Sequence, residues 1–537
     1  MRVDVWAPRA SRSVDVVVGD RRTALGPGER GSWSAAVEGL GPGGDYGFSL
    51  DGGPVRPDPR SRHQPHGVHG PSRVVDPGAF AWSDRDWRGF DLARAVLYEI
   101  HVGTFSPEGT FDGAIACLDH LVDLGVDAVE LMPVAEFPGQ RGWGYDGVAL
   151  WAPHDAYGGP DGLRRLVDAC HARGLGVLLD VVYNHVGPVG NYLGEFGPYF
   201  DKRHTSHWGP ALNLEGPGSD GVRSFVVDNA RMWLRDYHVD GLRLDAVHAL
   251  VDDSAVHLLE QLSTLVRALA AELGRPLWLI GESDLNAPRF VQPPEHGGYG
   301  LDATWADEWH HALHAALTGE RDGYYADFGP LALLAKALRQ AWVYDGVWSP
   351  HRLRTFGRPP TGLHGSQFVV SAQNHDQIGN RAAGERLGHL VSPEQARTAA
   401  ELLLTAPFVP LLFQGEEWAA STPFPYFTDH APELGAAIRD GRAREFAAFG
   451  WRPEDVADPQ DPATFAGAVL RWDERDRPGH AEMLAWYREL IARRRRTPGL
   501  ATGPLDDVEV AVDEADGRLK LRRRAAGLDL EVRISPG

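Results

Sequence analysis

Three carboxylates stand at the ends of three apolar segments that are predicted to be strands. Asp245 follows VDGLRL, Glu282 follows PLWLIG, and Asp376 follows FVVSAQNH. Burying an ionised group is costly unless the group is paired or has a chemical task. Three such groups, each on its own strand and far apart in sequence, predict one acidic pocket built by converging strands. Two carboxyl groups beside one bond, one as acid and one as nucleophile, are the minimum equipment for cleaving a glycosidic linkage.

The residues around these acids favour different roles for the first two. Arg243 lies two residues before Asp245, so strand alternation places both side chains on one face. A neighbouring guanidinium keeps a carboxylate ionised, as a nucleophile requires. Glu282 follows an apolar strand and has other carboxylates nearby, so we expect a raised pKa and the role of a protonated general acid. A buried Arg–Asp ion pair without catalysis is the alternative interpretation.

Other polar residues follow the same predicted strands. Asp180 and His185 lie in VLLDVVYNH, and Asp180 is expected to face Arg243 inside the fold. His185 and His375 are candidates to donate hydrogen bonds to sugar hydroxyls, although a lone histidine is more often structural. Tyr145, in the glycine-rich segment RGWGYDGV, is placed to stack on a sugar ring.

Eight strand candidates alternate with several helical segments from about residue 93 onward. Five of the candidates are nearly continuous apolar runs, which indicates burial on both faces and therefore parallel strands beneath helices. Eight βα repeats predict a TIM (β/α)8 barrel, whose active site lies at the carboxyl ends of the strands. The strand candidates are residues 95–105, 126–134, 174–185, 239–247, 276–283, 301–307, 367–376 and 407–417. The helical segments are residues 113–124, 161–173, 221–238, 253–273, 331–342 and 392–405, with 481–496 as the last barrel helix.

Both ends of the chain have a different pattern from the middle. Residues 3–52 alternate in short β-like runs between Gly, Pro and Asp turns, which predicts a small β-sandwich. The Pro-, His- and Gly-rich segment 51–73 is predicted to be a linker on the surface. Residues 506–534 predict a short β-unit too small for its own core, so it should pack against the barrel. The predicted domains are a β-sandwich at 1–85, a catalytic barrel at 90–498 and a C-terminal β-unit at 499–537.

The composition favours a neutral substrate. The chain has 537 residues, and 74 acidic residues against 53 Lys and Arg give a formal charge of −21. An acidic surface repels phosphate backbones and anionic lipids, so neither nucleic acid nor membrane is an expected partner. The 17 Trp and 14 Tyr are suited to stacking on sugars, although most Trp residues outside loops are expected to be core residues.

The sequence predicts no disulfide, no cofactor and no metal. Cys117 and Cys170 lie in segments with helical periodicity and are expected to be buried free thiols. Asp and Asn are plentiful enough to improvise a calcium site, but there is no dense EF-hand-like loop. No stretch approaches the roughly 20 apolar residues of a membrane span, and the N-terminus has no signal-like apolar region. A cytoplasmic location is therefore expected.

Four short segments carry a resemblance to a known family. DVVYNH, GLRLDAVH, LIGES and QNHDQ resemble, in order and spacing, the four sequence blocks of the α-amylase superfamily, glycoside hydrolase family 13. The resemblance implies that Asp245 is the nucleophile, Glu282 the acid/base and Asp376 the transition-state stabiliser. It also implies that the subsite for the covalently attached sugar is lined by Tyr145, Asp180, His185, Arg243 and His375.

Longer segments resemble the trehalose-releasing hydrolases of that superfamily. These segments are LDAVHALVDDS, GESDLN, FVVSAQNHDQIGNRA and PLLFQGEEWAASTPFPYFTDH. The resemblance implies hydrolysis of the α-1,4 bond next to the terminal trehalose of maltooligosyl trehalose, and functional pairing with the synthase that makes this substrate. His248 and Gln377 are hypothesised to contact the trehalose side, whereas the C-terminal β-unit is shorter than in the family.

Two other functions remain open from the sequence. A glycogen branching enzyme would use the same residues and the same covalent intermediate, with a sugar hydroxyl in place of water as the acceptor. A non-catalytic carbohydrate-binding relative on the same barrel typically lacks one or more of the three acids, and this chain has all three.

Overall fold

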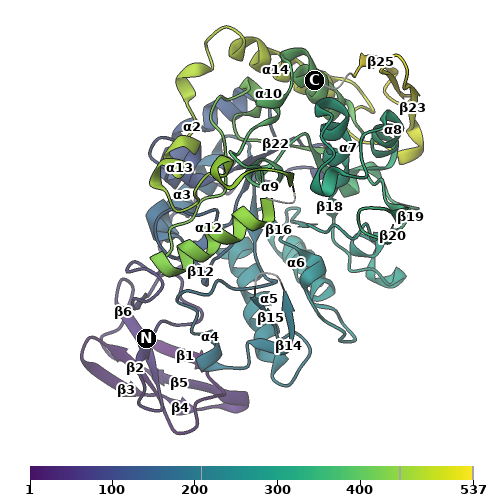
Figure 1. Ribbon diagram of the computed structural model, residues 1–537. Helices are drawn as coiled ribbons and strands as arrows, with labels where there is room; N and C mark the ends of the chain where they lie inside the picture. The colour runs from purple at the N-terminus through teal and green to yellow at the C-terminus, as the bar shows by residue number, and fades with distance from the viewer. Residues whose placement is uncertain (207–208, 447–448, 535–537) are drawn as a thin grey trace.

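Eight parallel strands close into a barrel at the centre of the molecule (Figure 1). The computed structural model describes residues 1–206, 209–446 and 449–534. The barrel strands follow one another in chain order, and the last pairs with the first. All eight lie inside the predicted segments, so the predicted (β/α)8 barrel is confirmed. They are β9 (Leu97–Ile100), β10 (Ala128–Leu131), β13 (Gly176–Val181), β16 (Gly241–Leu244), β17 (Trp278–Gly281), β18 (Ala303–Trp305), β21 (Phe368–Ser371) and β22 (Val409–Phe413).

The inside of the barrel changes from apolar to charged along the strands. Near the amino ends, a buried apolar cluster includes Leu97, Ala128 and Leu178. Two residues further along the same strands stand Glu99, Glu130 and Asp180, which are also buried. Since side chains alternate between the two faces of a strand, both sets point into the barrel. The apolar layer thus closes the base, and the charged layer lies toward the carboxyl ends.

Helices surround the barrel where the sequence predicted them, with small shifts at their ends. α6 begins five residues later than predicted, because His257 caps it by accepting a hydrogen bond from the backbone N–H of Leu259. These helices are α2 (Phe111–Leu124), α3 (Gly159–Ala172), α5 (Ser219–Asp236), α6 (Leu258–Leu273), α8 (Leu331–Gln340), α11 (Pro393–Thr405) and α14 (His480–Arg496). The sequence analysis did not predict a further helix, α7 (Asp307–Thr318), which begins two residues after the short strand β18 ends.

Two small sheets at the N-terminus form the predicted β-sandwich. One sheet has the order β1-β5-β4 and the other β3-β2-β6-β7, and Val3, Val14 and Phe48 are buried in its core. The strands are β1 (Arg2–Trp6), β2 (Val14–Val18), β3 (Arg21–Ala24), β4 (Gly26–Pro27), β5 (Ser32–Ala36), β6 (Asp45–Leu50), β7 (Val55–Arg56) and β8 (Ser72–Arg73).

The predicted linker at 51–73 runs over the surface for most of its length, but part of it belongs to the fold. β7 and β8 within this segment both pair with β6. Gln64 is fully buried, and its side-chain oxygen accepts hydrogen bonds from Ser61 Oγ at 2.6 Å and Ser72 Oγ at 2.9 Å. The Pro and Gly content did not predict these strands or this buried polar group.

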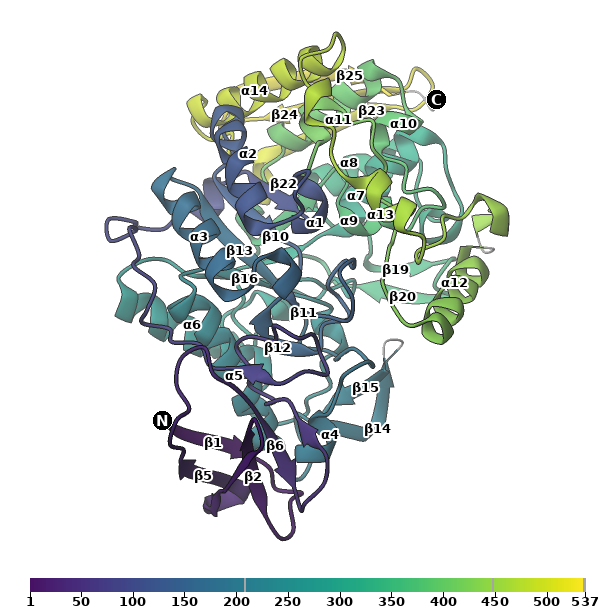
Figure 2. The same cartoon turned by 90° about the vertical axis from the view of Figure 1, so that its left-hand side faces the viewer.

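The C-terminal residues form an antiparallel sheet that packs against α8, as predicted. Its strands are β23 (Val508–Asp513), β24 (Arg518–Arg523) and β25 (Leu528–Arg533). Arg339 of α8 donates a hydrogen bond to the carbonyl of Val510. Figures 1 and 2 show this sheet and the N-terminal sandwich at opposite ends of the molecule.

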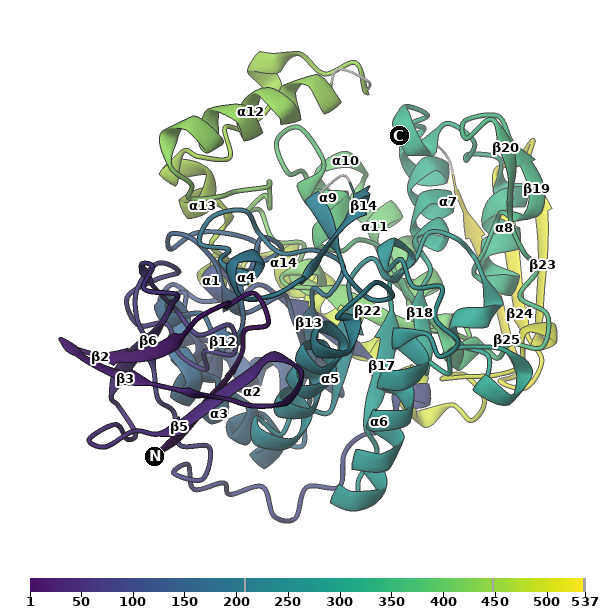
Figure 3. The same cartoon turned by 90° about the horizontal axis from the view of Figure 1, so that it is seen from below.

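Long connections after the barrel strands add hairpins and short helices. Figure 3 shows α12 at the edge of the molecule, away from the terminal sheets. These additions are β11 (Ala135–Glu136) with β12 (Ala149–Pro153), β14 (Phe200–Ser206) with β15 (Gly209–Leu212), β19 (Asp345–Ser349) with β20 (Arg354–Gly357), α9 (His375–Gly379), α10 (Leu387–Leu390), α12 (Pro432–Phe446) and α13 (Pro462–Ala468).

Both cysteines are free thiols, as predicted. Cys170 is buried, whereas Cys117 is partly exposed, which corrects the expectation that both are buried. Within the described residues, no helix combines the length and the apolarity needed to cross a membrane.

Candidate active site

Arg243 is the centre of the charged groups at the carboxyl ends of the barrel strands. Its side chain is only 1% exposed. Nη1 donates to Asp180 Oδ2 at 2.8 Å and to Asp245 Oδ1 at 2.9 Å, while Nη2 lies 3.2 Å from Glu282 Oε2. The guanidinium also lies over the ring of Trp305, 4.2 Å from its centroid. One cation therefore holds three carboxylates in a single site, including the predicted contact with Asp180.

Asp245 directly follows β16, where the chain leaves the barrel. Its Oδ1 accepts a hydrogen bond from Arg243, and its Oδ2 accepts one from Asn184 Nδ2 at 2.7 Å. The two bonds fix the direction of the carboxylate, while 14% of its side chain remains exposed. A fixed and partly accessible carboxylate is what attack on a bound sugar requires.

Glu282 occupies the equivalent place after β17. Its Oε2 accepts a hydrogen bond from the backbone N–H of Ala246 at 2.6 Å. Ala246 has a φ of 41°, a left-handed conformation that is unfavourable for alanine and that turns its N–H toward Glu282. Burial raises the pKa of Glu282, Arg243 partly opposes this, and the charge of Asp245 adds to it. The predicted rise in pKa is confirmed in direction, as a general acid requires.

Asp376 lies on a helix and not at the end of a strand, which corrects the prediction. β21 ends at Ser371, and Asp376 is in the first turn of α9. The helix starts here because Asn374 caps it, accepting from the backbone N–H of Asp376 at 2.9 Å, with Gln377 completing a capping box. Asp376 Oδ1 accepts a hydrogen bond from Asn380 Nδ2 at 2.7 Å, and burial raises the pKa of this carboxyl.

Asp376 nevertheless interacts with the group around Arg243. The charges of His375 and Arg243 lower its pKa, and the charge of Glu282 raises it. Glu282 thus interacts electrostatically with Asp376 and, as described above, with Asp245, which links the three predicted acids through Glu282.

Tyr145 and His375 form the next layer of the site. Tyr145 Oη lies 2.6 Å from Asp180 Oδ2 and 2.8 Å from His375 Nε2, and its ring stacks on that of His375 with centroids 5.1 Å apart. Burial raises the pKa of Asp180 to about 7, with Arg243 opposing the rise. The chain of contacts joins loop, strand and helix residues that the sequence placed separately.

The remaining predicted residues lie around this network. His185 Nε2 is 2.9 Å from the carbonyl oxygen of Tyr145, so it braces the loop that carries the tyrosine. His248 is partly exposed and lies 3.9 Å from Asp284, two residues past Glu282. The side chain of Gln377 is buried in the cap of α9, with its Nε2 3.4 Å from Asp307 Oδ1.

Sequence reasoning missed two further acids at this site. Asp307 closes the predicted strand segment in TWAD and begins α7 two residues after β18, so the rule that found the other acids would also have found it. Burial and the charges of Glu282 and Asp376 raise its pKa to about 8. Glu99 lies on β9 and contacts His375 Nδ1 at 2.5 Å. Its strand position inside an apolar segment was the available signal.

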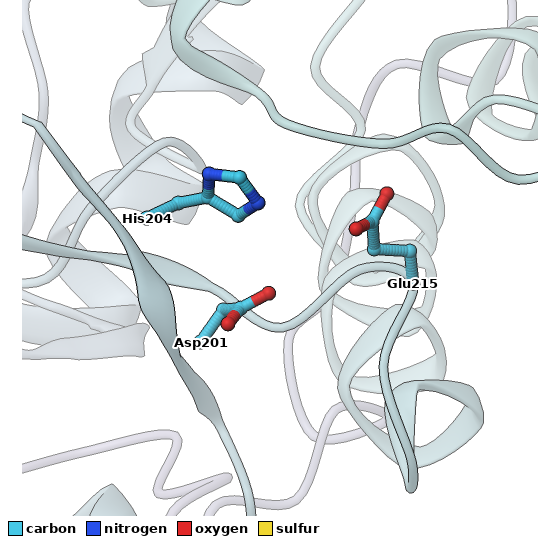
Figure 4. A group of neighbouring side chains, drawn as sticks. All are labelled: Asp201, His204 and Glu215. Carbon is cyan, nitrogen blue, oxygen red and sulfur yellow. The ribbon is translucent and has the colours of Figure 1, made fainter.

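One cluster outside this site has the residue types of a metal site. Figure 4 shows Asp201, His204 and Glu215, whose potential ligand atoms lie within 4.8 Å of one another. Arg203 already occupies the carboxylates, with Nη2 2.6 Å from Asp201 Oδ2 and 2.8 Å from Glu215 Oε1. The cluster is therefore an ion-pair group in this structure.

Comparisons with known proteins agree with the fold and the site. The family model of the α-amylase catalytic domain matches residues 75–208. A crystal structure of a protein described as an α-amylase from Salmonella typhimurium has a TM-score of 0.92, 39% identity, and coverage of 99% of this chain and 90% of that chain. A pullulanase from Paenibacillus barengoltzii has a TM-score of 0.70 with 20% identity, covering 98% and 84%, and shares the fold. The barrel and its arginine-linked acids define a glycoside hydrolase of the α-amylase family.

Relatives over the full chain narrow this class. Malto-oligosyltrehalose trehalohydrolase from Arthrobacter ramosus is 53% identical over 100% of this chain and 93% of its own length. The enzyme of the same name from Saccharolobus solfataricus is 43% identical over 93% and 85%. The chain belongs to the malto-oligosyltrehalose trehalohydrolase family. A branching enzyme from Burkholderia thailandensis matches at 32% identity over only 57% of this chain and 42% of its own length.

Proposed function

We propose that this enzyme hydrolyses the α-1,4-glucosidic bond next to the terminal trehalose of maltooligosyl trehalose, releasing trehalose and a maltooligosaccharide. The observation that carries the proposal is the guanidinium of Arg243 shared by Asp245 and Glu282. Because both carboxyl groups contact the same planar guanidinium, the two carboxyl groups lie close to each other. This agrees with a retaining mechanism, which needs about 5–5.5 Å between them, better than with widely separated acids.

The first half of the reaction uses both acids at once. Asp245 attacks the anomeric carbon on the side of its exposed edge, and a covalent glycosyl-enzyme forms as the glycosidic bond breaks. Glu282, whose raised pKa favours the protonated form, gives its proton to the oxygen of the departing trehalose. Neither step needs a cofactor.

The second half returns both acids to their starting states. Glu282 is now a base and takes a proton from water, whose oxygen attacks the anomeric carbon and releases Asp245. Asp376 accepts hydrogen bonds from sugar hydroxyls and stabilises the oxocarbenium-like transition state. Arg243, His375 and the other residues of the network hold the sugar that is covalently attached to Asp245.

In this scheme, each remaining predicted residue belongs either to the subsite of the attached sugar or to the trehalose side. Tyr145, Asp180 and His185 belong to the subsite of the attached sugar. His248 and Gln377 belong to the trehalose side, supported by the position of His248 near the loop that follows Glu282.

A product assay tests the proposal directly. The enzyme is incubated with maltooligosyl trehalose, with plain maltooligosaccharides of equal length as the control, and the products are separated by chromatography. Free trehalose from the first substrate is the expected result. If trehalose is absent from the products and new α-1,6 branches form on amylose, the enzyme is a branching transferase instead. If the chain binds the oligosaccharide tightly without turnover, it is a non-catalytic relative.

The cellular setting and the domain division belong to the same proposal. The substrate would be supplied by a maltooligosyltrehalose synthase, and the enzyme would work in the cytoplasm, where free thiols such as Cys117 and Cys170 persist. The domains would be residues 1–85, 90–498 and 499–537, since β1 to β8 end at Arg73 and β23 begins at Val508.

A further inference from the structure

Two glutamates lie side by side inside the barrel, beneath the proposed catalytic acids. Glu99 on β9 and Glu130 on β10 are register partners on neighbouring strands, and each is 1% exposed. The two positions share residue type, depth and orientation. Their hydrogen-bond partners differ, so the two glutamates can be compared within one protein.

Glu99 is bound to His375 by both of its oxygens. Oε1 lies 2.5 Å from the ring nitrogen Nδ1, and Oε2 accepts the backbone N–H of the same residue at 3.1 Å. Neither carboxyl oxygen of Glu130 has a hydrogen-bond partner among the described residues. One glutamate thus fixes a residue of the site, and its neighbour fixes none.

The contacts of His375 indicate which of its two ring nitrogens carry a hydrogen. A ring nitrogen that faces a carboxylate carries a hydrogen, so Nδ1 is a donor to Glu99. The other nitrogen, Nε2, points to Tyr145 Oη at 2.8 Å, on the side where the sugar subsite is proposed. An imidazole with hydrogens on both nitrogens can donate in both directions.

We infer that Glu99 is a positioning residue for the reaction, which holds His375 as an imidazolium whose Nε2–H donates to Tyr145 Oη beside the proposed sugar subsite. The inference rests on the proposed function. Tyr145 Oη gives its own hydrogen to Asp180 and therefore accepts from His375, and because charged donors form stronger hydrogen bonds than neutral ones, the Tyr145 side of the subsite would be held more firmly. Because the charge of Glu99 offsets that of His375, the site gains this donor without a net positive charge beside the oxocarbenium-like transition state.

The other charged groups around His375 are consistent with this assignment. Burial and Arg243 lower the pKa of His375, but Glu99 outweighs them, with a smaller contribution from Asp376, and raises it to about 9. Burial and the charge of Glu99 raise the pKa of Glu130 well above its usual range, which favours its neutral form.

Three further residues, Asp180, Tyr145 and His101, lie near Glu99 and His375. Asp180 reaches His375 through Tyr145, and the buried His101 has its pKa lowered to about 4 by burial and by the charge of His375, so it is also neutral. Glu99 is therefore the carboxylate in direct contact with the ring.

The matched variants E99Q and E130Q test the inference. Each replaces a carboxyl group by an amide of nearly the same size at equivalent positions, but only E99Q removes a carboxyl group that contacts His375. We expect kcat/KM for trehalose release to fall about 10- to 100-fold in E99Q, less than complete loss of a transition-state donor costs, and to change little in E130Q. E99D, which keeps a carboxylate, should recover part of the loss.

The pH at which His375 loses its proton is a second measurement, and a purely structural role of Glu99 would leave it unchanged. In protein with labelled histidine, NMR should show the His375 ring still protonated at pH 8 in the wild type and in E130Q. In E99Q, the ring should lose its proton at a lower pH. Thermal unfolding of each variant checks that it is folded.

Three results would overturn the inference. They are a wild-type His375 that is neutral at pH 7, an unchanged titration in E99Q, or equal activities of E99Q and E130Q. The wild-type titration needs no variant, so it decides even if E99Q does not fold. If wild-type enzyme releases no trehalose, the proposed function fails, and the titration still reports on Glu99 separately.

Discussion

Two aspartates bracket the strand β16, and they belong to opposite ends of the barrel. Asp240 directly precedes Gly241 at the amino end, and Asp245 directly follows Leu244 at the carboxyl end. The side chain of Asp240 is 0% exposed, whereas that of Asp245 is 14% exposed. The same residue type, five positions apart at the two ends of one strand, serves two different purposes.

The group around Asp240 is closed and fully paired. One oxygen accepts from Trp87 Nε1 at 2.8 Å and is paired with Arg275, and the other accepts from Val177 N at 2.9 Å and lies 3.0 Å from His171 Nε2. His171 Nδ1 lies 2.8 Å from an oxygen of Asp84, in the loop that precedes the barrel. These bonds tie that loop to the base of the barrel.

The group around Asp245 leaves its charges available. Asp245 and Glu282 share one guanidinium, and both remain partly exposed. Burial raises the pKa of Glu282 and, to about 8, that of Asp307. The comparison shows that full pairing gives stability at the base, whereas incomplete pairing and shifted pKa values at the opposite end supply chemistry.

The largest expected effect comes from removing the charge at the carboxyl end. Asp245→Asn should lower kcat on the order of 10⁴-fold or more, because the amide cannot act as the nucleophile. Its unfolding free energy should fall less than in the matched change at the amino end, because one hydrogen bond is lost while Arg243 keeps Asp180 and Glu282 as partners. Initial rates of trehalose release and urea unfolding measure the two quantities. Near-normal turnover would remove Asp245 from its proposed role.

The matched change at the amino end should give the opposite result. Asp240→Asn leaves His171 and Arg275 without their buried carboxylate, and breaking such a pair costs about 3–5 kcal/mol of unfolding free energy. The kcat of the folded fraction should stay close to that of the wild type. A variant that keeps its stability but loses activity would contradict the division between the two ends.

The base should also make stability depend on pH. Burial lowers the pKa of His171, but Asp240 and Asp84 outweigh it, so the folded pKa is raised above the unfolded value of about 6.5. Its stabilisation is therefore complete below the unfolded pKa and is lost as pH rises through the folded pKa. Urea unfolding from pH 5.5 upward should show this decline in the wild type and a flatter profile in His171→Asn. Equal slopes in both proteins would exclude His171 as the cause.

Asp84 affects the same dependence of unfolding free energy on pH, but at acid pH. Burial raises the pKa of Asp84, but His171 and His238 outweigh it and lower the pKa well below its usual range. Its contribution is present above the unfolded carboxyl pKa and is lost only in strong acid. Asp84→Asn should therefore lose stability at neutral pH and be closer to the wild type at low pH.

The smallest expected effect concerns the trehalose side of the active site. His248→Ala should raise KM for maltooligosyl trehalose several-fold, which corresponds to about 0.5–1.5 kcal/mol for one hydrogen bond, with kcat less affected. Because His248 is partly exposed, the unfolding free energy should not change. An unchanged KM would place trehalose recognition on other residues.

The sequence was sufficient for the barrel and for most of the acids. Continuous apolar runs must be buried on both faces, and five such runs among the eight strand candidates predicted the barrel. Asp245 and Glu282 were found because a charged residue directly after an apolar strand lies at the mouth of the barrel. Asp307 closes the strand candidate 301–307 in the same way, but it was not identified.

Other features depended on the tertiary structure. Asp376 was assigned to a strand, whereas the cap at Asn374 starts a helix before it. The segment 51–73 was assigned to a surface linker, whereas Ser61, Gln64 and Ser72 within it form a buried hydrogen-bonded group. Local composition cannot show which partners a polar group will find, because those partners come from distant parts of the chain.

The order of apolar runs and acids along the chain determined the barrel and the end of it where the chemistry belongs, because alternation and burial act over a few residues. Only the closed barrel decided that Glu99 meets His375 and that Glu282 joins Asp180 and Asp245 around the one guanidinium of Arg243. Those contacts link different strands, and their strength depends on distances and burial that exist only after the barrel has closed.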